Sequence, residues 1–542
     1  MAPLYLGVDA GTSGVRACLI DGEKKGEREK RERERGGESK NKRRTKTTHS
    51  LPARGGDLSP SPTCWECTRA GGGDGVPASL LGQRPPDTSQ PTPLSPLFSP
   101  TGTGAIAAEA KVPYPPTLAG PVDWAAAWRG GLVDALAALP PASLAATAGA
   151  AVAGTSASVL LVDAGGDFGA PLAPARLYSD AAPPAAVAAL RALAGGGHTA
   201  AAPTASAAKA MAWWLEGQEQ EADAGSAGLA AALAGAASPA VVSAADWMAA
   251  LLAGDAARLA WTDDNNALKA GWDPGARRYE PWLASHPVAA WLAPRVVPPG
   301  GRTVTVVEQP APSASSSPAP LLPAGCVVAG GTTDSIAAYV AALGPDSPPT
   351  PTAVTSLGST LALKLASPVR VDDPATGVYS HRLGGAWLVG GASNVGCKAL
   401  ADFFSPQQLG DLSARIDPAT PSPCDFYPLP AGTVGERFPV PDPAATPRVT
   451  PRPADDAAFL AGLLEGIARV EAAGYARLAA LGAPYPARVL TAGGGAANPV
   501  WAAMRARVLG VGDVGPAAQG EAAYGAALLA RASVVGGEGA GR

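Results

Sequence analysis

The chain has 542 residues, which is more than a single domain usually holds. Hydrophobic residues make up 46% of it, enough to build a core, so a wholly disordered protein is excluded. The 66 Gly and 56 Pro follow no Gly-X-Y period, which excludes collagen. A formal net charge of −4 argues against sequence-general nucleic-acid binding.

Cysteine, histidine and hydropathy patterns exclude further classes of protein. Six Cys are scattered over the chain, too sparsely for a disulfide framework, and the four His stand too far apart for ordinary zinc-ligand spacing. The longest uncharged run, 135–162, is long enough to span a bilayer but is too weakly apolar to insert. We therefore expect a soluble intracellular protein with reduced thiols.

Composition changes abruptly at Gly22. Residues 22–103 begin with a Lys/Arg/Glu run and continue as Pro/Ser/Gly/Thr-rich sequence, with 15 Lys and Arg against 10 Asp and Glu. Such sequence buries too little surface to fold, so we predict a disordered insert, or a wrongly retained piece of gene model. A nucleic-acid or targeting patch is disfavoured by the mixed charges, and Cys64 and Cys67 lack the second pair of a zinc knuckle.

The insert stands where a hairpin turn would connect two predicted strands. Lengthening a turn to about 80 residues costs only about 2–3 kcal/mol of closure entropy, so we expect the fold to survive it. The remainder alternates apolar strand-like runs with Ala-rich helical stretches, which indicates an α/β architecture. Strands are expected at 4–8, 15–20, 107–112, 148–153, 159–163, 327–330, 353–357, 361–365, 386–389 and 488–491. Helices are expected at 124–139, 184–194, 207–216, 244–252, 335–342, 455–481 and 499–509.

Two related domains are predicted. Pro-rich linkers could lie at 309–323 or 345–352, and we place the boundary at the second, between residues 1–344 and 353–535. A unit of strand, Gly-Thr/Ser turn and strand occurs at Val8–Ala17 and again at Ser356–Lys364. A hairpin duplicated in this way suggests two similar domains facing one cleft.

The first copy of this hairpin carries groups suited to phosphate binding. Gly11 and Gly14 allow a tight turn, and Thr12, Ser13 and the turn amides offer donors to phosphate oxygens. Asp9, at the end of a buried strand, could hold Mg²⁺ directly or through water. An ordinary capped hairpin turn is the alternative, and the second copy of the motif weighs against it.

Gly330–Ser335 follows a predicted strand and opens a helix. Asp334, near the helix N-terminus, is a candidate general base for a hydroxyl that attacks a phosphoryl group. A plain N-cap is an equally good interpretation of this residue taken alone.

A second glycine-rich loop, Gly493–Asn498, lies between a strand and a helix that starts at Pro499. Gly493, Gly494 and Gly495 would let a flat base or ribose lie against the backbone, with helix amides near phosphate. A purely structural loop is the alternative.

Hydroxyl groups and a carboxylate gather in two further segments. Thr155 and Ser156 lie between two strands of the first domain, and Asp180 ends the run Tyr178-Ser179-Asp180. Polyol recognition needs such donors and acceptors, although simple turn chemistry explains each residue equally well.

These motifs together resemble the FGGY family of carbohydrate kinases, and within it the plant and cyanobacterial D-ribulose kinases, often labelled xylulose-kinase-like. The similarity covers essentially all of the chain except residues 22–103. It runs through LGVDAGTSGVRACLID, AGTSASVLLVD, TDDNNALKAGWDP, GGTTDSIAAYVAALG, SLGSTLALKL, GASNVGCKAL and GGGAANPVW, and continues to Ala527.

The resemblance implies two actin-like, ribonuclease-H-like domains that close over a cleft. It assigns Asp334 as the catalytic base, with Ser335 beside it near the sugar. It places Gly11, Thr12, Ser13, Gly358, Ser359, Thr360, Gly493, Gly494, Gly495 and Asn498 around ATP, Asp9 at Mg²⁺ and the substrate, and Thr155, Ser156 and Asp180 at the sugar. Tyr178 replaces the Trp of a Trp-x-Asp motif, and relatives have a short turn in place of the insert.

The expected activity is phosphorylation of D-ribulose by ATP and Mg²⁺ to give D-ribulose 5-phosphate. D-xylulose or another polyol is an alternative substrate. A non-kinase, actin-like nucleotide-binding module and a pseudoenzyme disabled by the insert are alternative functions. A small-molecule sugar is the expected partner, without nucleic acid or membrane. We expect a cytoplasmic protein, or a chloroplast one if a transit peptide precedes the residues given.

Overall fold

The computed structural model describes residues 2–11, 13–22, 104–114, 122–195, 198–222, 228–307, 319–345 and 351–535. The predicted disordered insert, apart from Gly22, lies outside these ranges, as do Thr12 and most of the predicted linker 345–352.

The first sheet has seven strands, built from residues before position 334. Along the sheet they are β11 (Arg302–Thr305), β12 (Val327–Ala329), β4 (Thr147–Gly154), β1 (Leu4–Ala10), β2 (Gly14–Asp21) and β3 (Ile106–Pro113), while β13 (Thr332–Thr333) also pairs with β4. The strands β1, β2 and β3 are antiparallel neighbours, whereas β4 is parallel to β1, β12 and β13.

The second sheet repeats this plan. Its order is β16 (Tyr379–Leu383), β17 (Ala386–Ser393), β15 (Leu361–Ser367), β14 (Thr352–Leu357), β18 (Arg488–Ala492) and β19 (Asp513–Pro516). An antiparallel hairpin, β14 and β15, is again followed by a third antiparallel strand and by parallel strands on the other side of β14. The predicted α/β class and the duplicated hairpin are confirmed.

Every strand and helix predicted above is present in the structure, with ends that differ by up to about six residues. The helices are α2 (Trp124–Ala137), α3 (Pro141–Ala145), α4 (Pro184–Ala194), α5 (Ser206–Ala222), α6 (Leu229–Gly235), α7 (Ala244–Ala253), α8 (Asp264–Leu268), α9 (Pro281–Ala284), α10 (Asp334–Leu343), α11 (Lys398–Ala401), α12 (Pro406–Ser413), α13 (Asp456–Ala480), α14 (Pro499–Leu509) and α15 (Ala522–Val535). Short strands complete the fold: β5 (Val159–Asp163), β6 (Pro239–Ser243), β7 (Trp261–Asp263), β8 (Trp272–Asp273), β9 (Arg278–Tyr279) and β10 (Arg295–Val297). None of the described helices is both long and apolar enough to cross a bilayer.

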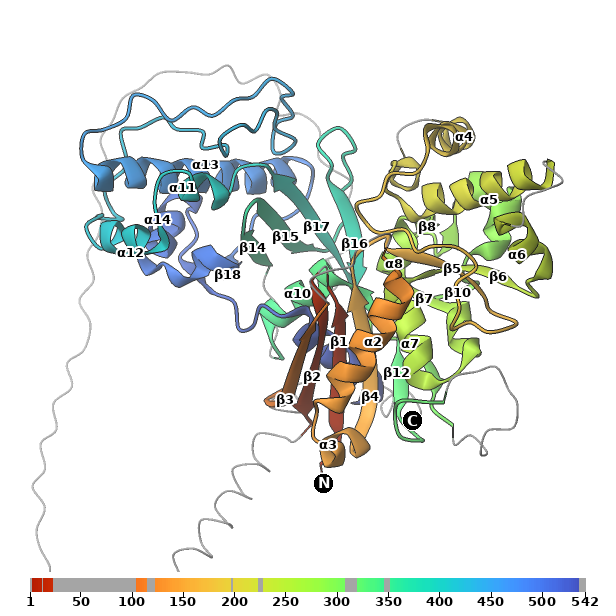
Figure 1. The fold of residues 1–542 in the computed structure, drawn as a ribbon. Helices are drawn as coiled ribbons and strands as arrows, with labels where there is room; N and C mark the ends of the chain where they lie inside the picture. The colour runs from red at the N-terminus through yellow and green to blue at the C-terminus, as the bar shows by residue number, and fades with distance from the viewer. Residues whose placement is uncertain are drawn as a thin grey trace, which may run out of the picture. The chain divides into compact units, whose positions relative to one another are not determined.

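Both faces of the central strand β1 are covered, so all seven of its residues are buried. Leu6 and Val8 point to one core together with Trp128 of α2, which lies beside β1 and β2 in Figure 1. The opposite face carries Gly7, and a Cβ there would lie 1.9 Å from the backbone oxygen of Ala523 in α15. Successive strand residues point to opposite faces, and the missing side chain lets α15 lie directly on the strand.

The C-terminal helix α15 thus returns to the first sheet, where it contacts β1, β4 and α10. Its Gly525 approaches α10 so closely that a Cβ would lie 1.9 Å from the Ala337 oxygen. The second sheet has its own core, in which Leu463 and Ile467 of the long helix α13 pack on Leu363 and Val389. In Figure 1, α13 runs along this sheet.

Candidate active site

Three parallel strands of the first sheet, β1, β4 and β13, end at one edge, and three predicted site residues lie at or directly after their ends. In the strand register, Ala153 of β4 lies between Asp9 of β1 and Thr332 of β13. Thr155 follows the end of β4, and Asp334 follows the end of β13. Because neighbouring strands are about 4.8 Å apart, the backbones of Asp9 and Thr332 are separated by about 10 Å. The structure therefore brings Asp9, Thr155 and Asp334 together.

Asp334 is the first residue of α10, as the sequence predicted. Its side chain is half-buried, and Oδ1 accepts a hydrogen bond of 2.6 Å from the backbone N–H of the exposed Ser335. Burial raises the pKa of Asp334, against the opposing effects of the Ser335 amide and of Lys364 and Lys269. Gly331 is required in this turn, since a Cβ there would lie 1.9 Å from the Val152 oxygen.

Asp9 is 4% exposed, and its Oδ1 has no hydrogen-bond partner. Arg16 Nη1 lies 3.8 Å from the other carboxylate oxygen and 2.5 Å from Glu521 Oε2. Burial is the main cause that raises the pKa of Asp9 to about 7; the charge of Asp334 adds to it, Arg16 opposes it, and Glu521 adds a smaller rise. A buried carboxylate with a raised pKa and an orphaned oxygen is a group that an incoming cation would stabilise.

The residues present fit a magnesium ion at Asp9. Mg²⁺ keeps several waters and is usually held by one or two carboxylates together with substrate phosphates, so a dedicated protein cage is not needed. The described residues contain no group of three or more His, Cys, Asp or Glu arranged around a common metal position. The orphaned Oδ1 of Asp9 offers the direct or water-mediated ligand.

The turn after β1 is tightly closed. Gly11 N–H donates to the Gly14 oxygen at 3.1 Å, and Tyr114 hydroxyl donates to the Gly11 oxygen at 3.3 Å. Gly14 needs to be glycine, because a Cβ would lie 2.2 Å from the Val112 oxygen. Ser13 is exposed, and its carbonyl accepts from Tyr114 N–H at 3.0 Å. Gly11 stands beside Asp9, since a Cβ on it would lie 3.6 Å from Asp9 Oδ2, while Thr12 is not described.

The corresponding turn of the second sheet touches the glycine-rich loop. Gly493 has φ +84°, and a Cβ there would lie 2.6 Å from the Leu357 oxygen at the end of β14. A Cβ on Gly495 would meet the Leu357 side chain at 2.7 Å, whereas Gly494 faces open space. The loop Gly493–Asn498 therefore lies against Leu357, directly before the turn Gly358–Thr360.

A cavity of about 590 Å³ opens beside this loop. Asn498 lines it, and its side chain caps α14 by accepting from Trp501 N–H at 3.0 Å while donating to Ser413 Oγ at 2.9 Å. Sequence analysis missed the opposite wall, which α12 and α13 supply. The lining is mainly apolar: Cys397, Leu400, Pro406, Leu409, Gly410, Ser413, Ala414, Leu464, Gly494, Gly495, Ala497, Asn498, Pro499, Val500 and Trp501.

Hydrogen bonds connect the segments that carry the predicted sugar-binding residues, and some of these residues already have partners within the protein. Thr155 Oγ1 and Ser158 Oγ are 2.5 Å apart, and Ser158 accepts from Tyr178 N–H at 3.0 Å. The exposed Asp180 accepts from Leu177 N–H at 2.7 Å and so closes its own turn. Ser156 is half-buried between β4 and β5. The structure therefore joins the segment after β4 to the 177–180 loop and leaves Ser156 as the less committed hydroxyl.

Sequence analysis missed the cations near Asp334. Lys364 of β15 is half-buried; burial lowers its pKa to about 8, while Asp334 opposes this fall. Burial also lowers the pKa of Lys269, at the C-terminus of α8, and Asp334 again opposes this fall. Burial, Lys364 and Lys269 hold the pKa of His381 well below its usual value. A lysine between Leu363 and Leu365 in an otherwise apolar strand was the available signal.

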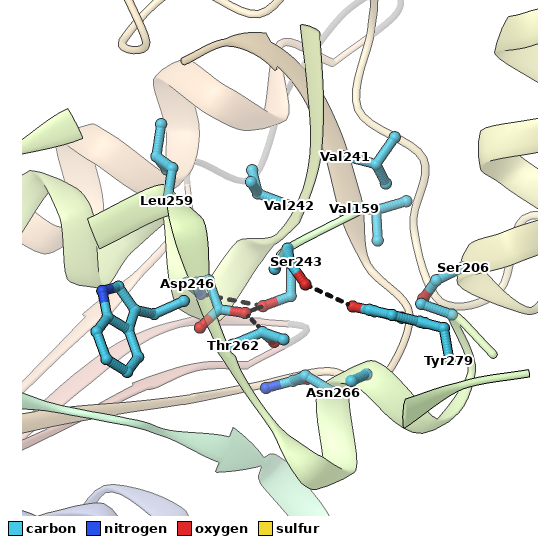
Figure 2. A pocket seen from close by; sticks show the side chains of 14 residues that line it. Val159, Ser206, Val241, Val242, Ser243, Asp246, Leu259, Thr262, Asn266 and Tyr279 are labelled. Atoms are coloured by element: carbon cyan, nitrogen blue, oxygen red, sulfur yellow. Dashed lines mark hydrogen bonds between the residues drawn. The ribbon is translucent and has the colours of Figure 1, made fainter. Parts of the chain in front are cut away.

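A second, much smaller cavity of about 30 Å³ lies among β6, α7 and α8. Figure 2 shows Ser243, Asp246 and Thr262 turned toward one another there. Asp246 accepts from both hydroxyls at 2.7 Å and from Arg258 at 3.1 Å, so this buried carboxylate is satisfied within the protein. The space suits about one water molecule, and we assign it a structural role.

Comparison with known proteins finds one matching family model and several solved structures of similar fold. Residues 354–534 match the FGGY family of carbohydrate kinases, C-terminal domain. The whole fold is similar to a xylulose kinase from Bifidobacterium adolescentis (17% identity, 99% of this chain and 93% of that chain, TM-score 0.63) and to a xyloylose kinase from Brucella ovis (20%, 98% and 91%, 0.62). It is also similar to Plasmodium falciparum glycerol kinase with ADP (12%, 98% and 89%, 0.61). At these identities the structural likeness establishes the fold, which is the predicted actin-like, two-domain arrangement.

Proposed function

We propose, from the match of residues 354–534 to the FGGY family of carbohydrate kinases, that this chain transfers a phosphoryl group from ATP to a ketopentose, with D-ribulose as the first candidate. The proposal assigns sugar binding and the catalytic base to residues 1–344 and nucleotide binding chiefly to residues 353–535. The observation that carries it is the pair Asp9 and Asp334 at one edge of the first sheet, where Asp9 lies near the end of β1 and Asp334 follows the end of β13.

In this proposal Asp334 acts as the general base. In the proposed reaction the oxygen of a sugar hydroxyl attacks the γ-phosphorus of ATP, the bond to the β-phosphate oxygen breaks, and ADP leaves. The hydroxyl proton passes to the Asp334 carboxylate. Such chemistry depends mainly on positioning and on charge stabilisation. The α10 N-terminus favours the ionised form of this acid, and Lys364 and Lys269 do the same.

The nucleotide site is proposed along the second sheet. The 590 Å³ cavity is in the size range of small-molecule sites, and its apolar walls suit an adenine ring. The glycine turns at 11–14 and 358–360 lead from the two sheets and offer backbone donors to phosphates. Mg²⁺ held at Asp9 would neutralise charge on the triphosphate oxygens.

Two ketopentoses remain as substrates. D-Ribulose is favoured by the resemblance of the 262–274, 330–344 and 391–400 segments to D-ribulose kinases. D-Xylulose is the second candidate, because solved structures similar in fold include xylulose kinases from Bifidobacterium adolescentis and Rhodospirillum rubrum. Ser156 and Ser335 are the proposed contacts to the sugar near Asp334.

The test is ADP release in the presence of D-ribulose, D-xylulose, ribitol or glycerol. The wild-type protein is expected to release ADP fastest with D-ribulose. Asp334→Asn should lose at least about 10³-fold in turnover while binding ATP as before, since it keeps the shape of the side chain but not its basicity. Asp134→Asn, which changes an exposed acid of α2, is the matched control.

The outcomes separate the alternatives. ADP release that no sugar accelerates would indicate a nucleotide-binding module and reject the kinase. Sugar-dependent turnover that Asp334→Asn leaves intact would reject this residue as the base. Faster ADP release with D-xylulose than with D-ribulose would support the kinase activity and make D-xylulose the proposed substrate.

A further inference from the structure

Asn265 is a buried residue of α8 whose side chain makes three hydrogen bonds to two distant segments. Asn265 is only 1% exposed. Its Nδ2 donates to Thr332 Oγ1 at 3.0 Å and to the Arg382 carbonyl at 2.9 Å, and its Oδ1 accepts from Arg382 N–H at 2.9 Å. Both amide protons and one oxygen lone pair are therefore used.

The first of these segments is the edge strand of the second sheet. β16 ends that sheet and pairs with β17. On an edge strand, alternate residues turn their N–H and C=O groups away from the neighbour, and these groups need another partner. The Asn265 amide meets both such groups of Arg382, as a further strand would. A side chain of α8 thus fastens the edge of the second sheet.

The second segment is the turn that carries the proposed base. Thr332 lies in β13, pairs with Ala153 of β4, and precedes Asp334 by two residues. Asn265 therefore contacts the Asp334 turn and β16 through a single planar group. No rotatable bond separates the atoms that contact the two segments, so a displacement of one is transmitted to the other.

Near β16, strand β15 carries Lys364, whose charge favours the ionised form of Asp334. In the register of the second sheet, Lys364, Gly390 and Tyr379 lie opposite one another on β15, β17 and β16. Residues opposite each other point to the same face, and glycine leaves space on it. Lys364 Cγ lies 3.3 Å from the place a Cβ on Gly390 would occupy. Tyr379 and His381 stand next along β16, with ring centroids 4.9 Å apart.

We propose that Asn265 is a positioning residue that locks the β16 edge, and with it the row containing Lys364, to the turn that carries Asp334. This inference rests on the proposed phosphoryl transfer. The hydrogen bonds of Asn265 form the joint that aligns the β16 edge with the turn that carries Asp334. A shift of about 1 Å in such an alignment costs on the order of 10²-fold in rate. Binding of ATP in the 590 Å³ cavity does not involve the joint and should be preserved.

The chain offers a matched control at the next position. Asn266 is also buried in α8, but its Nδ2 donates to Asp263 Oδ2 at 2.6 Å, three residues away. We expect Asn265→Ala to lower kcat on the order of 10²-fold with the KM for ATP changed less than about threefold, and Asn266→Ala to keep kcat within about threefold. Should Asn265→Ala not fold, Asn265→Asp keeps the volume and the acceptor but removes both donors, and the same loss of kcat is expected.

A second measurement does not depend on activity. Hydrogen exchange at the Arg382 amide should accelerate at least about tenfold in Asn265→Ala, which lacks the Oδ1 acceptor of this amide, over the wild-type protein. It should remain slow in Asn265→Asp, which keeps that acceptor, and in Asn266→Ala. If the wild-type protein phosphorylates a sugar and Asn265→Ala matches Asn266→Ala in kcat and exchange, the inference is overturned. If it phosphorylates no sugar, the proposed function fails, and Arg382 exchange alone decides whether the joint exists.

Discussion

The charge of Asp334 raises the pKa of Asp9, although Asp9 lies in β1 and Asp334 follows β13, with β4 between the two strands. Burial is the larger cause, and together these effects outweigh the attraction of Arg16. The carboxyl edge of the first sheet is therefore short of positive charge. A cation bound with the nucleotide would relieve this shortage, which makes the stability of the free protein sensitive to pH and to Asp9.

Replacing Asp9 by Asn should stabilise the free protein at high pH. The pKa of Asp9 rises from 3.8 to about 7 on folding, so between these values the folded state holds a proton that the unfolded state releases. Stability from this group therefore falls as pH rises through that window. Asp9→Asn escapes the fall, and its Tm should equal the wild-type value near pH 4 and exceed it by a few degrees at pH 8.5.

Thermal unfolding at pH 4, 7 and 8.5 without nucleotide checks this expectation. Mg²⁺ with ATP should stabilise the wild-type protein more than the variant at pH 8.5, and the variant should be inactive as a kinase. A variant that melts below the wild-type protein at pH 8.5 would contradict the argument.

Lys364 should shape the acid limb of the pH profile. Its charge favours ionised Asp334, so Lys364→Met should raise the pKa of Asp334 and move the acid limb of kcat/KM to higher pH. Burial lowers the pKa of Lys364 itself to about 8, so its charge is present below that pH and is lost as pH rises through it. Lys364→Arg, which stays charged, should keep the acid limb at its wild-type position.

The measurement is kcat/KM from pH 5.5 to 9.5 for the three proteins. Lys398→Met, at an exposed position of α11, serves as the control and should reproduce the wild-type profile. Superimposable profiles for the wild-type protein and Lys364→Met would show that Lys364 does not act on the base.

Local sequence patterns were sufficient to predict the strands around both turns and the positions of Asp9 and Asp334. Leu4–Val8 and Ala353–Leu357 are short apolar runs that end in glycine turns, and parallel strands place their ends at one edge. The three consecutive glycines at 493–495 likewise indicated a loop that approaches Leu357. These features are determined by residues adjacent in the sequence, and local patterns were therefore enough to predict them.

The residues that were missed depend on distant contacts. Asn265 meets Arg382, 117 positions away, and nothing in either segment signals the other. The sequence analysis did not predict helix α15, whose contacts with β1 and α10 rest on Gly7 and Gly525 fitting backbone atoms far along the chain. Asp180 was predicted to meet the sugar, and its carboxylate accepts from Leu177 N–H in its own turn, the alternative weighed for it.

Filling the 590 Å³ cavity should weaken nucleotide binding and leave the sugar site unaffected. Ala414 lines the cavity at the end of α12, and a phenyl ring there would occupy space proposed for adenosine. Ala414→Phe should raise the KM for ATP at least about tenfold, with the sugar KM within about twofold. Ala401→Phe, on the exposed side of α11, is the control. An unchanged KM for ATP in a folded Ala414→Phe would move the nucleotide site elsewhere.

Removal of residues 23–103 should leave the site intact, because the described residues on either side already form a closed hairpin end. Asp21 N–H donates to the Ala105 oxygen at 3.0 Å, and Ile20 lies opposite Ile106. Joining Gly22 to Gly104 gives a two-residue Gly-Gly turn, which suits antiparallel strands. Tyr524 hydroxyl, which donates to the Gly104 oxygen at 3.0 Å, fixes the position of that junction.

We therefore expect the shortened protein to match the full chain in kcat and in both KM values within about threefold. Circular dichroism and ADP release measured side by side check this. A shortened protein that gains at least tenfold in kcat would support the interpretation that the full chain is disabled by its insert. A folded shortened protein that loses activity would show that residues 23–103 contribute to the β2–β3 side of the site, against the view that the hairpin from Gly14 to Pro113 is complete without them.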